Sequence, residues 1–173
     1  MKRVISYKFF HSNLIVTSEL VLSRVLFNIL ANIDNSSNGS NLDSMTTLET
    51  IIIKGLKILL VDDDIGFRNS MAWKLSRKFK VNIREANSGF EALQIVINED
   101  HFDVILLDLI MPDKNGIETF KELRLLGIQS QIHIMSAFET SGEWKTAQAL
   151  GIPIISKNYN EQELIEILLK GKN

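Results

Sequence analysis

From residue 57 onward, apolar positions follow two alternating patterns. Short runs rich in isoleucine, leucine and valine alternate with longer segments in which apolar residues recur every three or four positions. The short runs, bounded by polar residues, predict strands buried on both faces, and the longer segments predict amphipathic helices. The predicted strands are 57–61, 81–85, 103–108, 131–135 and 153–155, and the predicted helices are 65–79, 89–98, 117–126, 139–150 and 159–170.

Residues at the helix ends support these boundaries. Ser88, with Glu91 three positions later, resembles a capping box, and Gly127 and Gly151 each follow the end of a predicted helix. Strands that alternate with helices predict parallel pairing through right-handed crossovers. The sequence therefore predicts an α/β fold, a doubly wound five-stranded parallel sheet with helices on both faces.

The first part of the chain has a different pattern. Apolar residues recur at helical spacing and predict an amphipathic helix over about 17–33. Residues 34–44 contain a single apolar residue, which predicts a flexible linker because such a tract buries too little surface to offset its ordering entropy. We expect a helical extension (1–33), a linker and lead-in (34–55) and one α/β domain (56–173).

The amino-acid composition argues against several classes of function. The formal net charge of -2 gives no electrostatic case for binding nucleic acid or an anionic membrane. The absence of cysteine excludes disulfides and thiolate metal sites and is compatible with the reducing cytoplasm, the expected location. No uninterrupted apolar run reaches the roughly 18 residues that a spanning helix needs. Glu19 and Arg24 interrupt the apolar part of the N-terminus, which argues against a signal peptide.

Polar side chains follow four of the predicted strands. Asp62, Asp63 and Asp64 come after the first strand, Asp108 ends the third, Ser136 follows the fourth, and Ser156 and Lys157 follow the fifth. In a doubly wound sheet, strand ends of this kind can converge on one crevice. Several carboxylates in one crevice repel each other unless a cation sits among them, and an all-oxygen set suits Mg²⁺.

This residue set suggests phosphoryl transfer. A carboxylate beside Mg²⁺ can attack a phosphoryl donor and form an aspartyl phosphate. Asp108 is the candidate nucleophile, because it ends a buried strand and precedes a loop rich in turn residues. Ser136 could donate a hydrogen bond to one phosphoryl oxygen, and Lys157 could pair with another.

Residues 56–170 resemble the receiver domain of two-component response regulators. The resemblance implies a sheet of strand order 2-1-3-4-5 and a phosphoryl group accepted from a histidine kinase or a histidine phosphotransfer protein. The matching pieces, in the family's order, are Lys57 to Asp64, Asp108 with Met111-Pro112 and Asn115-Gly116, Met135-Ser136-Ala137, and Lys157.

The resemblance also implies a role for each site residue. Asp108 would be the phosphoacceptor, Asp63 a direct magnesium ligand and Asp62 an acid that acts through water. The backbone carbonyl of Ile110 would be a third protein ligand. The remaining matches are Ser136 with the switch hydroxyl and Lys157 with the phosphate-binding lysine. Such a domain catalyses only its own phosphorylation and dephosphorylation, so we do not expect an enzyme with an external substrate.

The sequence departs from the family pattern at three places. Asn158 follows the lysine where the family usually has a proline joined by a cis bond, so this peptide is either trans or strained. Ile154 stands where the family usually has the aromatic residue that moves on activation. Ile110 and Phe138 are apolar where some relatives carry polar groups, which leads us to expect slow loss of the phosphoryl group.

The output of the chain is expected to be protein contact. No helix-turn-helix or enzyme domain follows the last predicted helix, which favours a stand-alone receiver. A downstream protein would read the 139–155 face, where Trp144 is either a core residue or an exposed binding anchor. The sequence leaves a homodimer open and names neither the kinase nor the target.

Three other functions remain open at this stage. A degenerate receiver could bind partners without phosphorylation, since the family's aromatic and proline are missing. A phosphohydrolase of the haloacid dehalogenase type would need a second acid at Ile110. The chain could also be a remnant of a hybrid kinase, because residues 23–32 resemble the asparagine box of sensor histidine kinases, with Asn28 and Asn32 at the matching positions.

Overall fold

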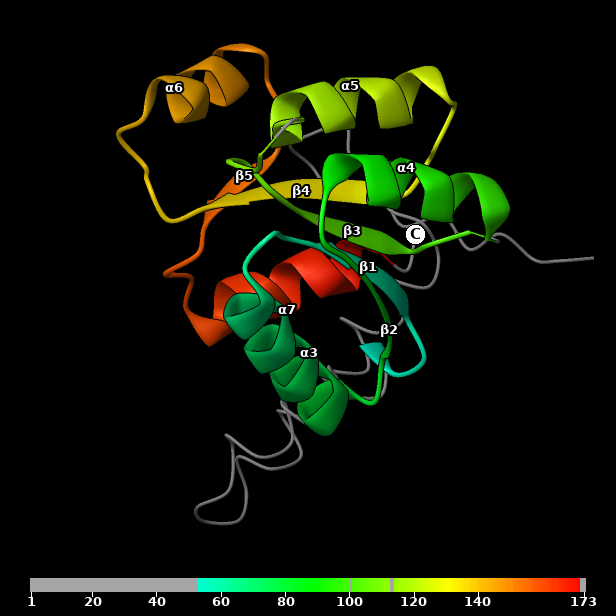
Figure 1. Cartoon of the computed structure of the whole chain (residues 1–173). Coiled ribbons are helices and arrows are strands. Elements are labelled where there is room, and N and C mark those ends of the chain that lie inside the picture. Colours follow the sequence, from blue (N-terminus) through cyan, green and yellow to red (C-terminus); the bar gives the residue numbers. More distant parts are fainter. Residues whose placement is uncertain (1–52, 100, 113, 172–173) are drawn as a thin grey trace, which may run out of the picture. The chain divides into compact units, whose positions relative to one another are not determined.

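The computed structural model describes residues 53–99, 101–112 and 114–171 (Figure 1). The predicted helix over 17–33, the asparagine-box resemblance over 23–32 and the predicted linker over 34–44 lie outside the described residues. The division of the chain at positions 33 and 55 therefore stays a prediction.

One parallel sheet forms the centre of the fold. Its strands are β1 (Lys57–Val61), β2 (Asn82–Ala86), β3 (Val104–Asp108), β4 (Gln131–Ser136) and β5 (Ile154–Ser156). Their order is β2-β1-β3-β4-β5, and every neighbouring pair is parallel. The predicted α/β fold and strand order are confirmed, and each strand boundary lies within one residue of its prediction.

Helices cover both faces of this sheet (Figure 1). The described helices are α3 (Ile65–Phe79), α4 (Gly89–Asn98), α5 (Gly116–Leu125), α6 (Gly142–Ala149) and α7 (Glu161–Lys170). Ile58 and Leu60 of β1 belong to an apolar cluster with α3 and α7, whereas Leu59 and Val61 belong to a cluster with α4 and α5. Because successive side chains of a strand point to opposite faces, β1 is buried between two helix layers.

Two glycines end their helices as predicted. Gly127 and Gly151 have φ values of +76° and +66°, a region that glycine enters without a steric penalty. The Ile128 amide donates to the Leu123 carbonyl at 3.1 Å. An equivalent bond joins the Ile152 amide to the Ala147 carbonyl at 3.0 Å. These are the bonds of a Schellman motif, which satisfies carbonyls at the helix end.

Two predicted helix starts are wrong by a few residues. The predicted helix over 139–150 begins at Gly142, because the Ser141 side chain caps it by accepting from the Trp144 amide. The predicted helix over 159–170 begins at Glu161, because Asn160 and Glu163 form a capping box. In both cases the capping side chain, rather than the apolar spacing, sets the first turn.

Candidate functional site

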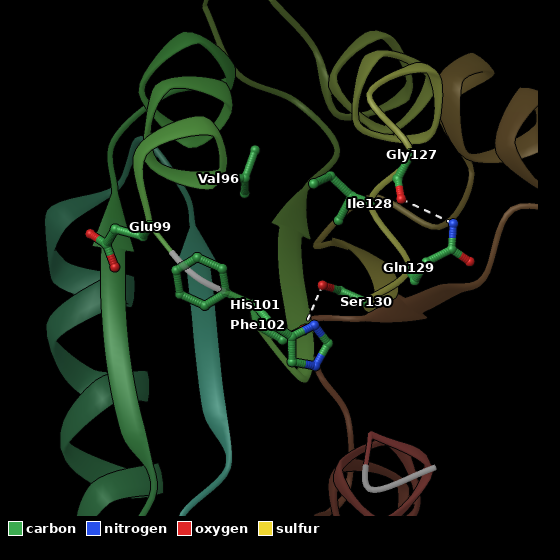
Figure 2. A pocket seen from close by; sticks show the side chains of 8 residues that line it. All are labelled: Val96, Glu99, His101, Phe102, Gly127, Ile128, Gln129 and Ser130. Atoms are coloured by element: carbon green, nitrogen blue, oxygen red, sulfur yellow. Dashed lines mark hydrogen bonds between the residues drawn. The ribbon is translucent and has the colours of Figure 1, made fainter.

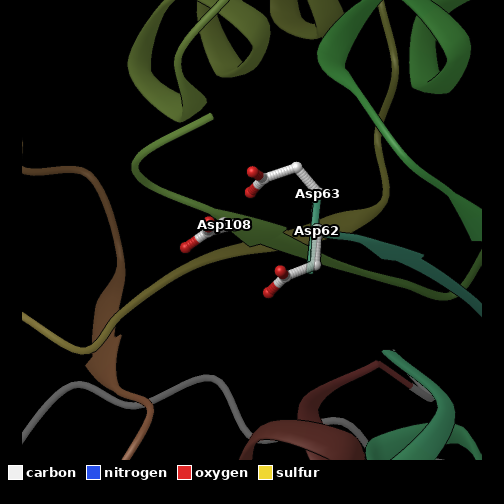
Figure 3. A group of neighbouring side chains, drawn as sticks. All are labelled: Asp62, Asp63 and Asp108. Carbon is white, nitrogen blue, oxygen red and sulfur yellow. The ribbon is translucent and has the colours of Figure 1, made fainter. Parts of the chain in front are cut away.

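Three carboxylates meet at the carboxyl ends of β1 and β3. Val61 pairs with Leu107, so Asp62 and Asp63 leave β1 beside Asp108 at the end of β3. One carboxylate oxygen from each acid lies within 4.8 Å of the others. Asp62 and Asp108 are buried and Asp63 is exposed. Figure 3 shows all three side chains extending to the same side of the strand ends.

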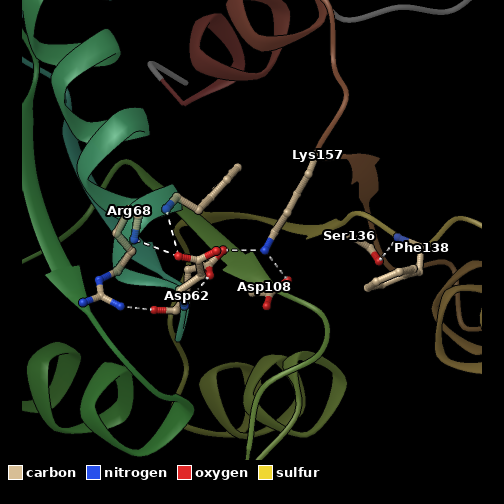
Figure 4. A network of polar contacts seen from close by, with 9 residues as sticks. Asp62, Arg68, Asp108, Ser136, Phe138 and Lys157 are labelled. Carbon is tan, nitrogen blue, oxygen red and sulfur yellow. Dashed lines mark hydrogen bonds and ion pairs between the residues drawn. The ribbon is translucent and has the colours of Figure 1, made fainter.

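Lys157 joins this group from the edge of the sheet. Its Nζ atom lies 2.6 Å from Asp62 Oδ2 and 2.9 Å from Asp108 Oδ1 (Figure 4). The side chain is 14% exposed. Its position depends on β5, which ends at Ser156, and on the Lys157 amide, which donates to the Ser136 carbonyl at 2.7 Å. The structure thus brings together Asp62, Asp63, Asp108 and Lys157.

Burial changes the proton affinity of both partners in the Asp108–Lys157 pair. Desolvation raises the pKa of Asp108 to about 6; Lys157 opposes this rise, and the charge of Asp62 adds to it. Burial by itself would lower the pKa of Lys157, but its hydrogen bonds to Asp62 and Asp108 outweigh that effect and raise it. At neutral pH Asp108 is therefore mainly a carboxylate that faces an ammonium group.

The loop after β1 is held by its own side chains. Asp62 Oδ1 accepts from the Asp64 amide at 2.9 Å, and Asp64 Oδ1 accepts from the Gly66 amide at 2.7 Å as the cap of α3. Arg68 Nη1 donates to the Asp62 carbonyl at 2.5 Å, and its Nε lies 3.4 Å from Glu85 Oε2. These bonds hold the loop that carries the acids.

Ser136 ends β4, one residue beyond the partner of Asp108. It is buried, and its hydroxyl oxygen accepts from the Phe138 amide at 3.0 Å. Figure 4 shows the Ser136 side chain joined to Phe138 and separated from Asp108. The predicted hydroxyl is thus adjacent to Asp108 in the sheet; its oxygen accepts from its own loop, and its O–H remains available to donate.

The structure shows the surroundings of residues 154 and 158, where the sequence departs from the family pattern. The described residues contain no cis peptide bond, and the Asn158 amide donates to Ser156 Oγ at 3.0 Å, a bond that proline could not make. Of the two states expected for this peptide, it adopts the trans state. Ile154 is half-buried and packs against the cluster that includes α4, α5 and α6.

The apolar neighbours of the site face solvent. Ile110 is 43% exposed and Phe138 is 64% exposed, although both are large hydrophobic residues. The backbone carbonyl of Ile110 remains the predicted third ligand. Its loop is anchored by the Leu109 amide, which donates to the Met135 carbonyl at 2.8 Å, and by the Gly116 amide, which donates to the Leu109 carbonyl at 2.9 Å.

Sequence reasoning missed the roles of Arg68 and Phe67 in shaping the site, whereas Gly116 belongs to the pieces that match the family. Arg68 holds the Asp62 backbone, and the Phe67 ring lies 4.5 Å from Lys157 Nζ. Gly116 lets α5 approach β3, because a Cβ there would lie 2.3 Å from the Asp108 carbonyl oxygen. One feature of the sequence could have identified Phe67 and Arg68: both lie in the first turn of a predicted helix that begins directly after the Asp62–Asp64 run.

The donor set fits a magnesium ion. Three carboxylates and one ammonium leave a formal surplus of two negative charges, -3 + 1 = -2, in a small and largely buried volume. Carboxylate oxygens are ligands that Mg²⁺ prefers, and a divalent cation would neutralise this surplus. Asp62, Asp63 and Asp108 are the side chains that could hold the ion.

A separate cavity lies at the other end of the strands. It has a volume of about 230 Å³ and is lined by residues that include Phe102, just before β3, and Ser130, just before β4 (Figure 2). Ser130 Oγ donates to the Phe102 carbonyl at 2.5 Å. Because parallel strands place their amino and carboxyl ends at opposite edges, this cavity is remote from the carboxylates.

No described helix, within 53–99, 101–112 and 114–171, combines the length and apolar character that crossing a membrane requires.

Comparisons with known proteins agree with the geometry. The family model described as "Response regulator receiver domain" matches residues 58–169. Among curated proteins, the transcriptional regulatory protein CiaR of Streptococcus pneumoniae is 36% identical over 119 residues, covering 66% of this chain and 52% of CiaR. The CpxR homolog of Haemophilus influenzae is 37% identical over 114 residues, covering 63% and 47% of the two chains. The chain thus spans about half the length of these relatives.

Solved structures give the same result. The chemotaxis protein CheY4 of Vibrio cholerae is 30% identical with a TM-score of 0.57, and the match covers 66% of this chain and 96% of CheY4. The receiver domain of the Francisella response regulator 1452 is 29% identical with a TM-score of 0.54, covering 69% of this chain and all of that domain (100%).

Proposed function

Because this chain belongs to the response regulator receiver family, we propose that it accepts a phosphoryl group on Asp108 and passes the signal on by protein contact. The donor would be a histidine kinase or a histidine phosphotransfer protein. The observation that carries the proposal is the convergence of Asp62, Asp63, Asp108 and Lys157 at one edge of the sheet.

The transfer is a displacement at phosphorus. One oxygen of the Asp108 carboxylate forms a bond to phosphorus while the bond from phosphorus to the donor breaks, and the donor leaves with that electron pair. Lys157, already 2.9 Å from Asp108 Oδ1, would pair with an oxygen of the transferred group. A bound Mg²⁺ would supply neutralisation of the charge on that group.

Ser136 is proposed to report the phosphorylated state. Its hydroxyl would leave the Phe138 amide and donate to a phosphoryl oxygen on Asp108. The loop after β4 would then lose one of its hydrogen bonds and favour another arrangement. Such a change is a population shift between two states of the loop and α6.

The downstream partner is proposed to bind the face formed by residues 139–155. This segment contains α6 and the start of β5, and Ala147 is the buried residue of the helix. Trp144 is half-buried and packs against the core cluster, which supports the interpretation as a core residue. Its accessible part is proposed as a binding anchor for the partner. We propose that the domain acts through this face in the cytoplasm, as a monomer or as a homodimer.

Intact mass spectrometry after incubation with acetyl phosphate and Mg²⁺ tests the proposed function. We expect the wild type to gain the mass of one phosphoryl group and Asp108→Asn to gain none, because an amide cannot replace the nucleophilic carboxylate. Asp103→Asn is a matched control at the other end of β3, since its side chain accepts from the Lys57 amide and lies away from the site. A wild type that gains no mass would contradict the proposal.

A phosphorylation-independent binding module is the second candidate. Ile154 and Asn158 favour it, because both stand where the family pattern has residues linked to switching. Pull-down with the phosphorylated wild type, the unmodified wild type and Asp108→Asn separates the two candidates. Equal partner capture by the phosphorylated wild type and by Asp108→Asn would support the second.

A further inference from the structure

One face of α3 holds the segment that follows β5. Phe67, Met71 and Lys74 are spaced at i, i+4 and i+7, so they lie along one side of the helix. Phe67 lies against Lys157 with 4.5 Å from the ring centroid to Nζ. The Tyr159 hydroxyl donates to Met71 Sδ at 2.9 Å, and Lys74 Nζ lies 5.3 Å from the Tyr159 ring. The helix therefore contacts the lysine and the residue two positions later.

The backbone amides of the segment from Lys157 to Tyr159 are hydrogen-bonded, but these bonds do not restrain the Lys157 side chain. The segment follows a strand of three half-buried residues at the edge of the sheet. Its described backbone bonds run from the Lys157 amide to Ser136, and from the Asn158 and Tyr159 amides to Ser156. Asn158 is exposed and does not fix its own φ as a proline would. The lysine thus depends on contacts from elsewhere in the fold.

Phe67 adds an aromatic contact to the Lys157 ammonium, with 4.5 Å from Nζ to the ring centroid. Two carboxylates, Asp62 and Asp108, accept from the ammonium, and the aromatic ring lies against the same group. A cation beside an aromatic face is attracted more strongly when water is excluded, and Lys157 is 14% exposed. The ring is itself held in place, because the Phe67 amide donates to Asp64 Oδ1 at 3.2 Å and its side chain packs against the α3–α7 cluster.

We propose that Phe67 is a positioning residue for Lys157, holding its ammonium at Asp108 where the family relies on a proline after the lysine. The inference rests on the proposed function, since it concerns how the lysine reaches a phosphoryl group on Asp108. It assigns a role to the aromatic ring rather than to apolar packing. A leucine at this position would keep much of the packing and lose the ring.

The first test compares the full-length wild type, Phe67→Leu and Phe67→Tyr. The readout is the rate constant for phosphorylation by acetyl phosphate in Mg²⁺, followed by intact mass. We expect Phe67→Leu to react about fivefold more slowly, from the size of a partly desolvated cation–π contact. Phe67→Tyr keeps an aromatic face and should remain within about twofold of the wild type. A wild-type rate in Phe67→Leu would overturn the proposal.

The second test does not require phosphorylation. Urea midpoints are measured for the wild type, Phe67→Leu, Lys157→Met and the double variant, without Mg²⁺ or phosphodonor. Coupling of the two side chains predicts that Phe67→Leu shifts the midpoint less when Lys157 is already methionine. Equal shifts in both backgrounds would mean that Phe67 is only a packing residue, and would overturn the proposal.

The two tests also separate this inference from the proposed function. A wild type that takes no phosphoryl group contradicts the proposed function, while the urea cycle still decides whether Phe67 holds the lysine. A normal reaction of the wild type combined with an unaffected Phe67→Leu supports the proposed function and rejects the positioning role.

Discussion

The centre and the edge of the sheet differ in how firmly they are packed. Every residue of β3 is buried, and four of the five residues of β1 are buried. At the edge, all three residues of β5 are half-buried, and α6 buries one residue, Ala147. Elements with few buried contacts open more easily than core strands. The nucleophile thus lies on the rigid part, and the proposed output surface lies on the part that can rearrange at low cost.

Lys157 connects the two regions. It follows the edge strand, yet its ammonium contacts acids that belong to the central strands. A phosphoryl group on Asp108 would compete for that ammonium and for the Ser136 hydroxyl, so events at the centre could change the position of the edge. In the proposed switch, the acceptor lies on a fully buried strand and the readout lies at a half-buried edge.

The largest expected effect is on folding stability. Leu106 of β3 is fully buried, and Leu106→Ala should lower the free energy of unfolding by about 2–5 kcal/mol, since it leaves a cavity between the sheet and the layer formed by α3 and α7. Ile155→Ala, a half-buried residue of β5, should cost about 1 kcal/mol because less surface is lost from the core. Urea denaturation measures both. Similar losses of stability at the two positions would mean that the centre and the edge of the sheet are equally firmly packed.

Because His133 of β4 is buried, we expect the free energy of unfolding to depend on pH. Burial, with a smaller contribution from the charge of Lys170, lowers the pKa of His133 from 6.5 to about 4. The unfolded chain therefore binds this proton more readily, and stability should fall as the pH drops from about 6.5 to 4, by up to about 3 kcal/mol.

Urea curves across that range, for the wild type and His133→Leu, isolate this effect from other titrating groups. His133 is 7% exposed, so leucine should be accommodated and the variant should lose less stability in acid. Parallel pH profiles for the two proteins would argue against the lowered pKa.

Lys157→Met should slow phosphorylation by acetyl phosphate about 100-fold, the usual consequence of removing one preorganised charge from a transferring group. Intact mass over time gives the rate. Lys145→Met, an exposed position on α6, is the matched control and should react as the wild type does. A small effect of Lys157→Met would mean that this lysine, at the edge of the sheet, contributes little to phosphoryl transfer, and would argue against the proposed link between the two regions.

A smaller kinetic effect than that of Lys157→Met is expected for the lifetime of the acyl phosphate. Ile110 and Phe138 are exposed apolar residues of the loops after β3 and β4, and we expect them to obstruct an in-line water. Replacing both by asparagine should shorten the lifetime about tenfold, equivalent to about 1.4 kcal/mol in the barrier. Ile97→Asn, exposed on α4, serves as control. Loss of the wild-type phosphoryl group within seconds would contradict slow hydrolysis.

The order of helices and strands could be predicted because each signal is local. Apolar runs such as that of β3 and the glycines after α5 and α6 act within a few residues, and the parallel sheet follows from their alternation. The acids Asp62, Asp63 and Asp108 were also predictable, since each occurs directly after or at the end of a strand. The starts of α6 and α7 were missed because Ser141 and Asn160 cap the helices later than the apolar spacing suggests.

By itself, the sequence determined the fold, the carboxylates and the lysine of this receiver, because those depend on residue type and on position along each strand. Only the tertiary structure decided which groups touch Lys157, where the Ser136 hydroxyl points and how the peptide before Asn158 is held. The physical reason is that the contacts of Lys157 join segments far apart along the chain, whereas the Ser136 and Asn158 bonds span two residues each but depend on loop conformations that the packed sheet imposes. The distances to Lys157 are set by how α3 and β5 pack on the sheet, which no local pattern records.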